Sequence, residues 1–413
     1  MPLNILNHIP RSISKIHKSI IPVKGNGSYI VCEAGRKYLD YTSGIGALST
    51  GHQHPQVISA VKHQLDNIIH APQQVFKSHP PQINLTKKLL TIMPTDNLTQ
   101  IFYTNSGSES TDNAIKIARR YTNKTNIISF YGGFHGRTLG AMAVSSSNTK
   151  TKEKSQPLIP GIFFCEPNIE SFKKILNLNT SPDETAAVIF EPVQGEGGIK
   201  NISNLFLKEL ELICKKNNIL IIDDEVQCGF GRTGTWWNIS QKNITADILT
   251  FGKGIGSGFP IAGLSTSKEI CEKLNVGYLG GTYGGNALVS EAANATIHVV
   301  EKENILNNVN IMGTRLNKGL NKKKDKTNLI KEIRQYGLMI AIEFYEENCD
   351  NYINSHKIVQ ILRDQYNILV LMAGYKNQYI RLLPPLNTTI SEVDEFIYSF
   401  NKALQRAHSL SKY

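Results

Sequence analysis

The sequence predicts an α/β protein in which a mainly parallel sheet is covered by helices. Short apolar runs alternate with amphipathic segments through the middle of the chain, which is the pattern of strand–helix–strand units. The 413 residues are 40% hydrophobic and 19% charged, which is ordinary for a globular protein and enough chain for two or three domains. No apolar run approaches the roughly 20 residues of a membrane-spanning helix, so we expect no membrane partner.

Five predicted strands are each followed directly by polar or glycine-rich residues. In open α/β sheets, ligands bind beyond the carboxyl ends of the strands, so we expect these five ends to form one site. The strands, each with the residues that follow it, are Gln100–Tyr103 (TNSGSES), Asn126–Tyr131 (GGFHGRT), Ala186–Phe190 (EPVQGEGG), Ile219–Ile222 (DDEVQCG) and Ile248–Phe251 (GKGIGSG).

Both ends of the chain predict a second, smaller domain of α+β type. A long helix over Leu288–Lys302 closes the first domain. We therefore predict a large domain over 50–303 and a small domain made of 1–49 and 304–413. The small domain's expected elements are strands at Ser28–Asp40 joined at Gly35, strands at Leu338–Tyr345 and Ile368–Met372, and a helix at Ile390–Ala407.

The net charge of +11 suggests nucleic-acid binding at first sight. Its densest cluster, Asn321–Lys326, has no groove-reading motif or aromatic interleaving beside it, and basic residues are otherwise scattered. We interpret the cluster as a solvated helix end or loop and expect no nucleic-acid partner.

Cysteine usage favours a reducing compartment. No CxxC pair occurs, which argues against a disulfide framework or a zinc site, and we expect no bound metal. The first 32 residues contain no acid and weakly resemble a transit peptide. We expect a cytosolic protein, with the mitochondrial matrix as the weaker alternative. The six cysteines are Cys32, Cys165, Cys214, Cys228, Cys271 and Cys349.

Three segments carry groups that fit a phosphorylated aromatic ligand. Gly107 and Ser108 open a predicted helix, where free N–H groups form an anion site, although taken alone an ordinary serine cap explains them better. Asp224 follows a strand and can pair with a protonated ring nitrogen, or equally cap a turn. Phe134 offers a flat ring for stacking, whereas an isolated aromatic is usually part of the core. Its neighbour His135 is interpreted as a structural hydrogen-bonding residue.

Lys253 lies between two glycines in TFGKGIGSGFP. The stretch is no phosphate-binding P-loop, because Gly254 follows the lysine where Ser or Thr is required, and Ser257 breaks the dinucleotide pattern GxGxxG. A phosphate site, a ring-stacking surface, an acid for a ring nitrogen and an amine for an aldehyde together describe pyridoxal phosphate (PLP). Lys253 would form its Schiff base, 253 − 224 = 29 positions after the acid, and burial beside positive charge would keep the amine neutral.

The segments that follow the five predicted strands, together with TFGKGIGSGFP, resemble those of the class-III PLP-dependent aminotransferases. The resemblance extends from about Ile20 to about Glu395. Further motifs in family order are GHQHP, FHGRT and GGTYGGN. The resemblance implies fold type I, with a mostly parallel seven-stranded sheet in a large domain and a smaller α+β domain formed by both chain ends. It also implies a homodimer, or a dimer of dimers, with shared active sites.

The same resemblance implies a role for each cofactor-binding residue. Lys253 is the Schiff-base lysine, Asp224 pairs with the ring nitrogen, and Phe134 stacks on the ring. The remaining contacts are the phosphate with Gly107 and Ser108, the ring with Val226, the ring hydroxyl with Gln227, and the phosphate of the neighbouring subunit with Thr282.

Four residues are implied to contact substrate and to select it. Arg137 and Arg381 are the two candidate carboxylate clamps, since a guanidinium matches a carboxylate bidentately. Glu196 resembles the family's switch acid, which pairs with Arg381 when an ω-amine donor is bound and releases it for 2-oxoglutarate. At the position of Ile45, the resemblance implies a Tyr in ornithine aminotransferases, where it contacts the donor's carboxylate. The 4-aminobutyrate and acetylornithine enzymes have Ile there, as this chain does.

The loop Ala373–Arg381, near the end of the chain, narrows the choice of amino donor further. Gly374 and Arg381 lie 381 − 374 = 7 positions apart, which resembles 4-aminobutyrate aminotransferases, while Ala287 departs from the Pro of many relatives. The predicted reaction moves the ω-amino group of 4-aminobutyrate to 2-oxoglutarate, giving a semialdehyde and glutamate. Acetylornithine, ornithine or another diamine donor is the alternative, and a non-enzymatic basic binding protein is a remote one.

Overall fold

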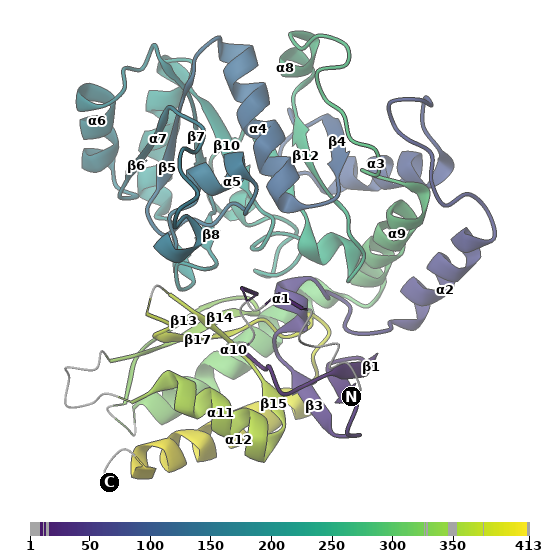
Figure 1. Cartoon of the computed structure of the whole chain (residues 1–413), viewed down its shortest axis with the longest axis vertical. Coiled ribbons are helices and arrows are strands. Elements are labelled where there is room, and N and C mark those ends of the chain that lie inside the picture. Colours follow the sequence, from purple (N-terminus) through teal and green to yellow (C-terminus); the bar gives the residue numbers. More distant parts are fainter. Residues whose placement is uncertain are drawn as a thin grey trace, which may run out of the picture.

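The structure is a computed structural model that describes residues 9–10, 12–13, 16–325, 327, 329–345, 353–374 and 376–410. The described part folds into two lobes, one above the other in Figure 1. The upper lobe comes from the middle of the chain, and the lower lobe combines early and late segments. Of the residues singled out above, Cys349 and Lys326 lie outside the described part.

A seven-stranded sheet organises the large lobe. Its strands are β4 (Gln100–Thr104), β5 (Asn126–Phe130), β6 (Ile162–Cys165), β7 (Thr185–Phe190), β10 (Leu220–Asp224), β11 (Ile248–Phe251) and β12 (Ala262–Thr266). The order is β4-β12-β11-β10-β7-β5-β6. β12 is antiparallel to both neighbours, and the other adjacent pairs are parallel. The expected mostly parallel seven-stranded sheet is therefore confirmed.

Alternate residues of the buried strands enter two separate cores. Phe130 packs with Phe206 on one face of the sheet, while Ile127 packs with Ala114 and Ile115 on the other. This division follows from the two-residue side-chain period of a strand. The helices of these layers are α4 (Gly107–Thr122), α5 (Leu139–Val144), α6 (Ile169–Leu178) and α7 (Asn204–Lys216).

The rest of the large lobe flanks the β4 edge of the sheet or lies in its loops. α2 (Pro55–Leu65) and α3 (Pro80–Ile92) both pack against α9 (Ala287–Lys302), at the right of Figure 1. The remaining elements are α8 (Lys268–Glu272), β8 (Val193–Gln194), β9 (Lys200–Asn201) and the 3₁₀ turns Thr149–Thr151, Asn238–Gln241 and Lys253–Gly256.

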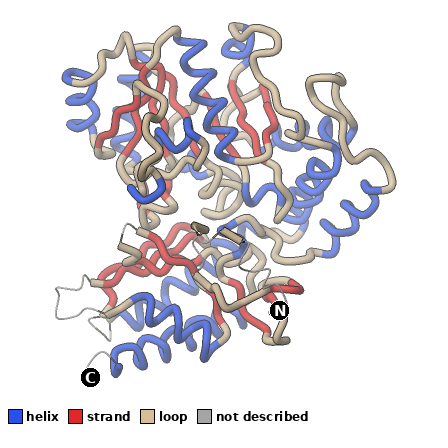
Figure 2. The backbone as a smooth tube through the Cα atoms, viewed as in Figure 1, coloured by secondary structure: helices blue, strands red, loops and turns tan. Residues whose placement is uncertain are grey.

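The small lobe holds two four-stranded sheets backed by helices. One sheet has the order β1-β2-β3-β15 and the other β13-β14-β17-β16. In Figure 2 the red strands of the second of these sheets face the large lobe, and blue helices lie on its far side. The elements are β1 (Pro22–Asn26), β2 (Tyr29–Cys32), β3 (Lys37–Asp40), α1 (Ser43–Gly46), α10 (Ile305–Lys324), β13 (Ile330–Tyr336), β14 (Met339–Phe344), α11 (Ser355–Tyr366), β15 (Ile368–Leu369), β16 (Leu371–Ala373), β17 (Tyr379–Leu382) and α12 (Ile390–Leu410).

The observed elements also correct the sequence-based ones. β6 and β12 were not expected, and the single strand expected over Ile368–Met372 divides at Val370 into β15 and β16, which belong to different sheets. The turn at Gly35 forms as expected, with a φ of 76°. The described part of the basic cluster forms the last turn of α10 and its end.

Among the described residues, no helix combines the length and apolar character needed to cross a membrane. In that same part of the chain, no group of three His, Cys, Asp or Glu side chains is arranged to hold a metal ion.

Candidate active site

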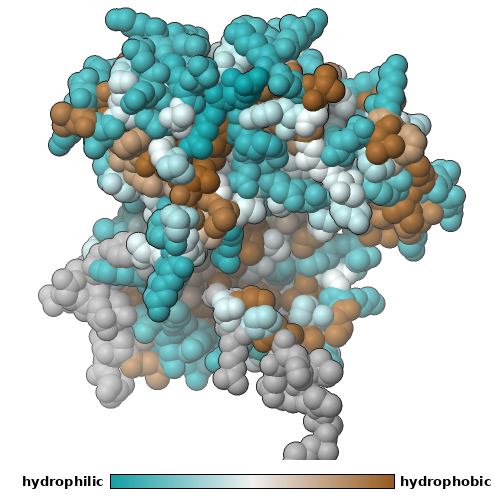
Figure 3. All heavy atoms as spheres, turned by 45° about the horizontal axis from the view of Figure 1, so that its top comes forward, coloured by the Kyte–Doolittle hydropathy of each residue, from teal (hydrophilic) through white to brown (hydrophobic). Residues whose placement is uncertain are grey.

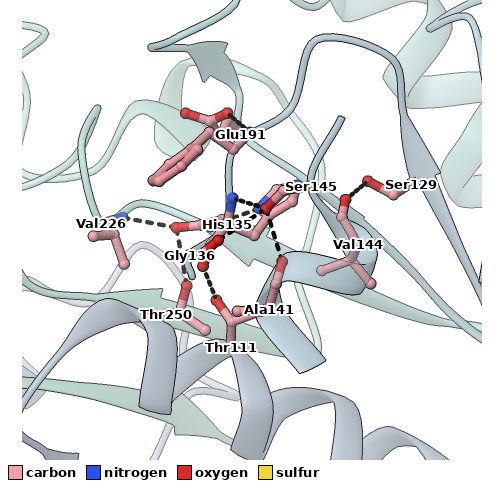
Figure 4. Close-up of polar contacts among 12 residues, drawn as sticks. Thr111, Ser129, His135, Gly136, Ala141, Val144, Ser145, Glu191, Val226 and Thr250 are labelled. Carbon is pink, nitrogen blue, oxygen red and sulfur yellow. Dashed lines mark hydrogen bonds and ion pairs between the residues drawn. The ribbon is translucent and has the colours of Figure 1, made fainter. Parts of the chain in front are cut away.

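Asp224 is the last residue of β10, and both of its carboxylate oxygens are held. Oδ1 accepts from the Val226 N–H at 3.1 Å and from the Thr250 hydroxyl at 3.2 Å. Oδ2 lies 2.7 Å from Nδ1 of His135, and because a carboxylate only accepts, the proton of this bond is on Nδ1. Figure 4 shows His135, Val226 and Thr250 converging on this point. The acid is thus fixed in position, and His135 is a hydrogen-bonding residue as predicted.

Lys253 follows the neighbouring strand, β11, and only Gly252 separates it from the end of that strand. Its backbone has a φ of 45°, a left-handed conformation that is uncommon for a non-glycine residue. The amine forms no hydrogen bond or ion pair with the residues that the structure describes. Burial lowers the pKa of Lys253, and Arg381 adds to this effect, whereas Glu196, Glu191 and Asp224 oppose it. A half-buried amine that has a lowered pKa and no partner among the described residues is suited to covalent attachment of an aldehyde.

Glu191, the residue directly after β7, connects two loops of the site. Its Oε1 accepts from the Phe134 N–H and its Oε2 from the Gly195 N–H, both at 2.9 Å. Figure 4 shows the carboxyl group of Glu191 above the loop that carries His135. Burial raises the pKa of Glu191 to about 7, with His135 opposing the rise and Asp224 adding to it.

The start of α4 lies against the segment after β10. A Cβ atom on Gly107 would be 2.6 Å from Cγ1 of Val226, so only glycine fits at this first helical position. Ser106 caps the helix by accepting from the Glu109 N–H at 3.3 Å. Ser108 accepts from the backbone N–H of Arg137 at 3.2 Å, which joins the helix start to the loop after Phe134.

Arg381, Glu196 and Gln227 form a polar group from three distant segments. Nη2 of Arg381 lies 2.7 Å from Oε1 of Glu196, and Nη1 donates to Oε1 of Gln227 at 3.2 Å. Arg381 is 2% exposed, on β17. The ion pair that the resemblance implied is therefore present, although its role in substrate exchange stays a prediction.

The other implied substrate contacts, and the cofactor contact Thr282, form no hydrogen bond or ion pair with this group in the described part of the chain. Ile45 is half exposed and has a left-handed backbone, with a φ of 63° that is strained for a β-branched residue. Its neighbour Ser43 donates to the carbonyl of Leu383 at 2.5 Å, two residues beyond Arg381. The side chains of Arg137 and Thr282 are exposed and have no polar contact with the other site residues in the described part of the chain.

Two site residues were not identified from the sequence. Glu191 holds the loop of Phe134, and Thr250 holds the carboxylate of Asp224. Glu191 had a usable signal, because it is an acid directly after a buried strand, as Asp224 is. Thr250 had none, since a threonine inside a strand is common.

The residues present fit PLP. Lys253 offers a free amine, Asp224 a fixed carboxylate, and the start of α4 a set of N–H groups beside the loop of Phe134. Nδ1 of His135 is bonded to Asp224, and its Nε2 is buried without a partner among the described residues.

Comparison with known proteins places the chain in a family. The family model "Aminotransferase class-III" matches residues 11–404. The chain therefore belongs to the class-III aminotransferases, which are PLP-dependent enzymes that move an amino group from a donor to a keto acid. Its cofactor is PLP, as the sequence predicted.

Several curated relatives carry different substrate names. The chain is 35% identical to the 5-aminovalerate aminotransferase DavT of Pseudomonas aeruginosa, covering 94% of this chain and 93% of that one. It is 33% identical to the 4-aminobutyrate aminotransferase GabT of Escherichia coli, covering 97% and 96%. It is 36% identical to an acetylornithine aminotransferase of Bacillus cereus, covering 92% and 94%.

Solved structures agree on the fold. A transaminase from the marine bacterium Virgibacillus matches with a TM-score of 0.90 and 26% identity, covering 98% of both chains. An amine transaminase from an uncultivated Pseudomonas species, in its PLP-bound form, matches with a TM-score of 0.88 and 25% identity, covering 96% of this chain and 98% of that one. The fold is that of the PLP-dependent transaminases.

Proposed function

We propose that this enzyme transfers the ω-amino group of an ω-amino acid, with 4-aminobutyrate as the first choice, to 2-oxoglutarate. The observation that carries the proposal is the 2.7 Å ion pair between Glu196 and Arg381, buried on the arginine side. A paired arginine leaves no free cation for a second carboxylate, which suits a donor with one carboxylate. An unpaired arginine binds the second carboxylate of 2-oxoglutarate.

The chain's residues divide the work as follows. PLP, when bound, supplies an electron sink for the bonds at the amine-bearing carbon. Asp224 keeps a positive charge at the ring nitrogen, and Lys253 Nζ moves the proton released at the donor carbon. Arg137 orients the carboxylate of the donor, while Ile45 contacts its chain. When PLP is bound, Gly107 and Ser108 would hold its phosphate, Phe134 and Val226 would contact its ring, and Gln227 would contact the ring hydroxyl.

Two further donors are supported by relatives of similar identity. 5-Aminovalerate is longer than 4-aminobutyrate by one methylene, and a single methylene is worth only about 1–3 kcal/mol in a pocket. Acetylornithine is supported by the relative from Bacillus cereus. The named curated relatives are bacterial, which favours the cytosol over a mitochondrial matrix.

A donor panel tests the proposal. Purified enzyme with PLP and 2-oxoglutarate is supplied in turn with 4-aminobutyrate, 5-aminovalerate, N-acetylornithine and ornithine, and glutamate is measured. We expect the highest kcat/KM with 4-aminobutyrate. A kcat/KM at least about tenfold higher with N-acetylornithine, equivalent to about 1.4 kcal/mol, would overturn the first choice. No glutamate with any donor would overturn 2-oxoglutarate as the acceptor.

We also propose that the enzyme works as a homodimer, with domain limits near 50 and 303. Thr282 is exposed and without a polar partner in the described chain, which suits a residue that reaches a second subunit. Several large apolar side chains are exposed at the end of α2 and in the segment between α2 and α3. They are Leu65, Ile68, Ile69, Val75 and Phe76. In Figure 3 brown side chains gather at the right of the upper lobe, on the side where α2 and α3 lie in Figure 1.

A further inference from the structure

The turn that carries Glu196, residues Gly195–Gly198, is held from both lobes. From the large lobe, Oε2 of Glu191 accepts from the Gly195 N–H at 2.9 Å. From the small lobe, the Gly374 N–H donates to the carbonyl of Glu196 at 3.2 Å. The backbone around Glu196 is therefore tied on both sides, independently of the ion pair that its side chain makes.

Arg334, on β13, closes the end of this turn. Its Nε donates to the carbonyl of Gly198 at 2.8 Å. Its guanidinium lies over the ring of Tyr379, with Cζ 5.0 Å from the ring centroid. A Cβ atom on Gly198 would be 2.6 Å from Cε2 of the same tyrosine, so the turn, the tyrosine and the arginine form one packed unit.

The sheet register places Arg334 and Arg381 in one row. Arg334 pairs with Ala341 of β14, and Ala341 pairs with Arg381 of β17. Directly paired residues project to the same face of a sheet, so both arginines project to the face that meets the turn. The small side chain of Ala341 between them leaves room for both. Arg381 binds the side chain of Glu196, and Arg334 binds the backbone two residues later.

Arg334 is itself fixed and its charge is balanced. Nη1 donates to Oε2 of Glu343 at 2.6 Å and also contacts Glu332. Oε1 of Glu343 is 2.7 Å from Nζ of Lys331. The side chain of Arg334 is only 12% exposed, so its geometry is largely shielded from solvent. A planar guanidinium suits this arrangement, because one group must serve a carbonyl, a carboxylate and an aromatic face together.

We propose that Arg334 is a positioning residue that clamps the 195–198 turn, so that the Glu196 carboxylate stays within reach of Arg381. The contacts of Arg334 are with Gly198, Tyr379 and acidic side chains, so we infer that it acts through Glu196. Its loss would weaken the Glu196–Arg381 pair and leave Arg381 uncompensated when a donor with one carboxylate is bound. Binding of 2-oxoglutarate, which needs a free Arg381, would be spared. The proposal rests on the proposed function.

The test compares the two half-reactions in Arg334→Gln. With 4-aminobutyrate in single turnover, we expect kcat/KM for amine uptake to fall about tenfold, the effect of losing a hydrogen bond to a charged group. Transfer of the amino group from loaded enzyme to 2-oxoglutarate should change less than about threefold. The double variant Arg334→Gln/Glu196→Gln should be no worse than Glu196→Gln alone, because the two residues act in series. Equal losses in both half-reactions, or additive losses in the double variant, would overturn the clamp.

Two controls separate this effect from general damage. Arg315, on α10, is also an arginine paired with a carboxylate, since it donates to Asp394 of α12 at 2.7 Å. Arg315→Gln should leave both half-reactions unchanged. If Arg334→Gln does not fold, Arg334→Lys serves, because it keeps a cation beside Glu343 while its single amine cannot also hold Gly198.

A crystal structure of the Arg334 variant gives a readout that does not depend on the donor. We expect the distance between Arg381 and the Glu196 carboxylate to exceed about 4 Å, the usual limit of an ion pair. An intact pair would overturn the clamp whatever the substrate. Conversely, wild-type enzyme that is inactive with 2-oxoglutarate and every donor would overturn the proposed function while leaving this structural comparison valid.

Discussion

At the scale of single residues, Glu191 shows how one buried carboxyl group can organise two loops. Each of its oxygens accepts a backbone N–H, one from Phe134 and one from Gly195. Hydrogen bonds favour the ionised form, but removal from water disfavours it more strongly, and the pKa of Glu191 rises to about 7. Its ionisation is therefore linked to the stability of the folded protein.

We predict that Glu191→Gln reduces the loss of stability on going from pH 5 to pH 8. The folded wild type binds the proton more tightly than the unfolded chain, where the pKa is near 4.5, so its stability falls as the pH rises toward about 7. The fall is at most about 3 kcal/mol, at 1.36 kcal/mol for each pKa unit. The variant should be less stable at pH 5, because an amide has one acceptor for two N–H groups, but its melting temperature should depend less on pH.

Melting temperatures of wild type and variant across this range, at saturating PLP, measure the effect. Glu301→Gln, on the exposed face of α9, controls for the loss of a surface carboxyl. Parallel curves for wild type and Glu191→Gln would show that Glu191 does not titrate in this window. His135 and Asp224, which interact electrostatically with this carboxyl group, and Lys253, with which it also interacts, are retained in both proteins.

At the scale of elements, the start of α4 makes the phosphate site that we propose. Successive N–H groups at a helix start carry partial positive charge and lack partners within the helix. Ser106 satisfies the N–H of Glu109, three residues on, which leaves those of Gly107 and Ser108 for a ligand. The helix can approach Val226 this closely only because position 107 has no side chain.

Gly107→Ala is predicted to weaken PLP binding about tenfold, because inserting a methyl group into a filled space costs about 1–3 kcal/mol. The new Cβ would lie 2.6 Å from Val226, so either the helix start or the residue under the ring must move. Titration of the apoenzyme with PLP, followed by fluorescence, measures the change. Arg120→Ala, on the exposed side of the same helix, should bind PLP like the wild type. An unaltered affinity in Gly107→Ala would argue against a phosphate site here.

At the scale of the whole molecule, the site is built where two lobes meet. Asp224, Lys253 and Glu191 come from the large lobe, whereas Arg381 comes from the small one. Arg232 helps to join the lobes, since its Nη1 donates to the carbonyls of Leu338 and Pro384, at 3.1 and 2.5 Å. Thr282 would complete the site from a second copy of the chain.

We predict that two inactive variants restore activity when they form a mixed dimer. Lys253→Ala lacks the covalent attachment point, and Thr282→Asp places a carboxylate against the partner's phosphate. In a dimer of one chain of each kind, the second chain's Lys253 would meet the first chain's intact Thr282. One of the two sites in each mixed dimer would then be complete, so the mixed dimer should have about half of the wild-type activity. Co-expression with two affinity tags, followed by assay of the doubly purified dimer, measures this. Mixed dimers without activity would place Thr282 outside the partner's site.

Local pattern was enough to predict most of the large sheet but not all of it. Five strands could be predicted because each is an apolar run followed by polar or glycine-rich residues. β12 did not, because its sequence AGLST is short of large apolar residues. A Cβ atom on Gly263 would lie 2.5 Å from Cζ of Phe251 on the adjacent strand, so packing against β11 requires a small residue there. The break at Val370 could not be predicted from local pattern either. The residues before it pair in one sheet and those after it in another, although together they form one apolar run.

By itself, the sequence determined the chemistry of this protein, because a lysine between glycines, an acid at a strand end and a glycine at a helix start fit PLP when they are taken together, although each alone has an ordinary structural explanation. Only the tertiary structure decided how these groups are held. The Glu196–Arg381 pair joins residues 381 − 196 = 185 positions apart, and the row of Arg334 and Arg381 depends on the register of three strands. Such contacts arise from the packing of one lobe on the other, and no local propensity encodes them.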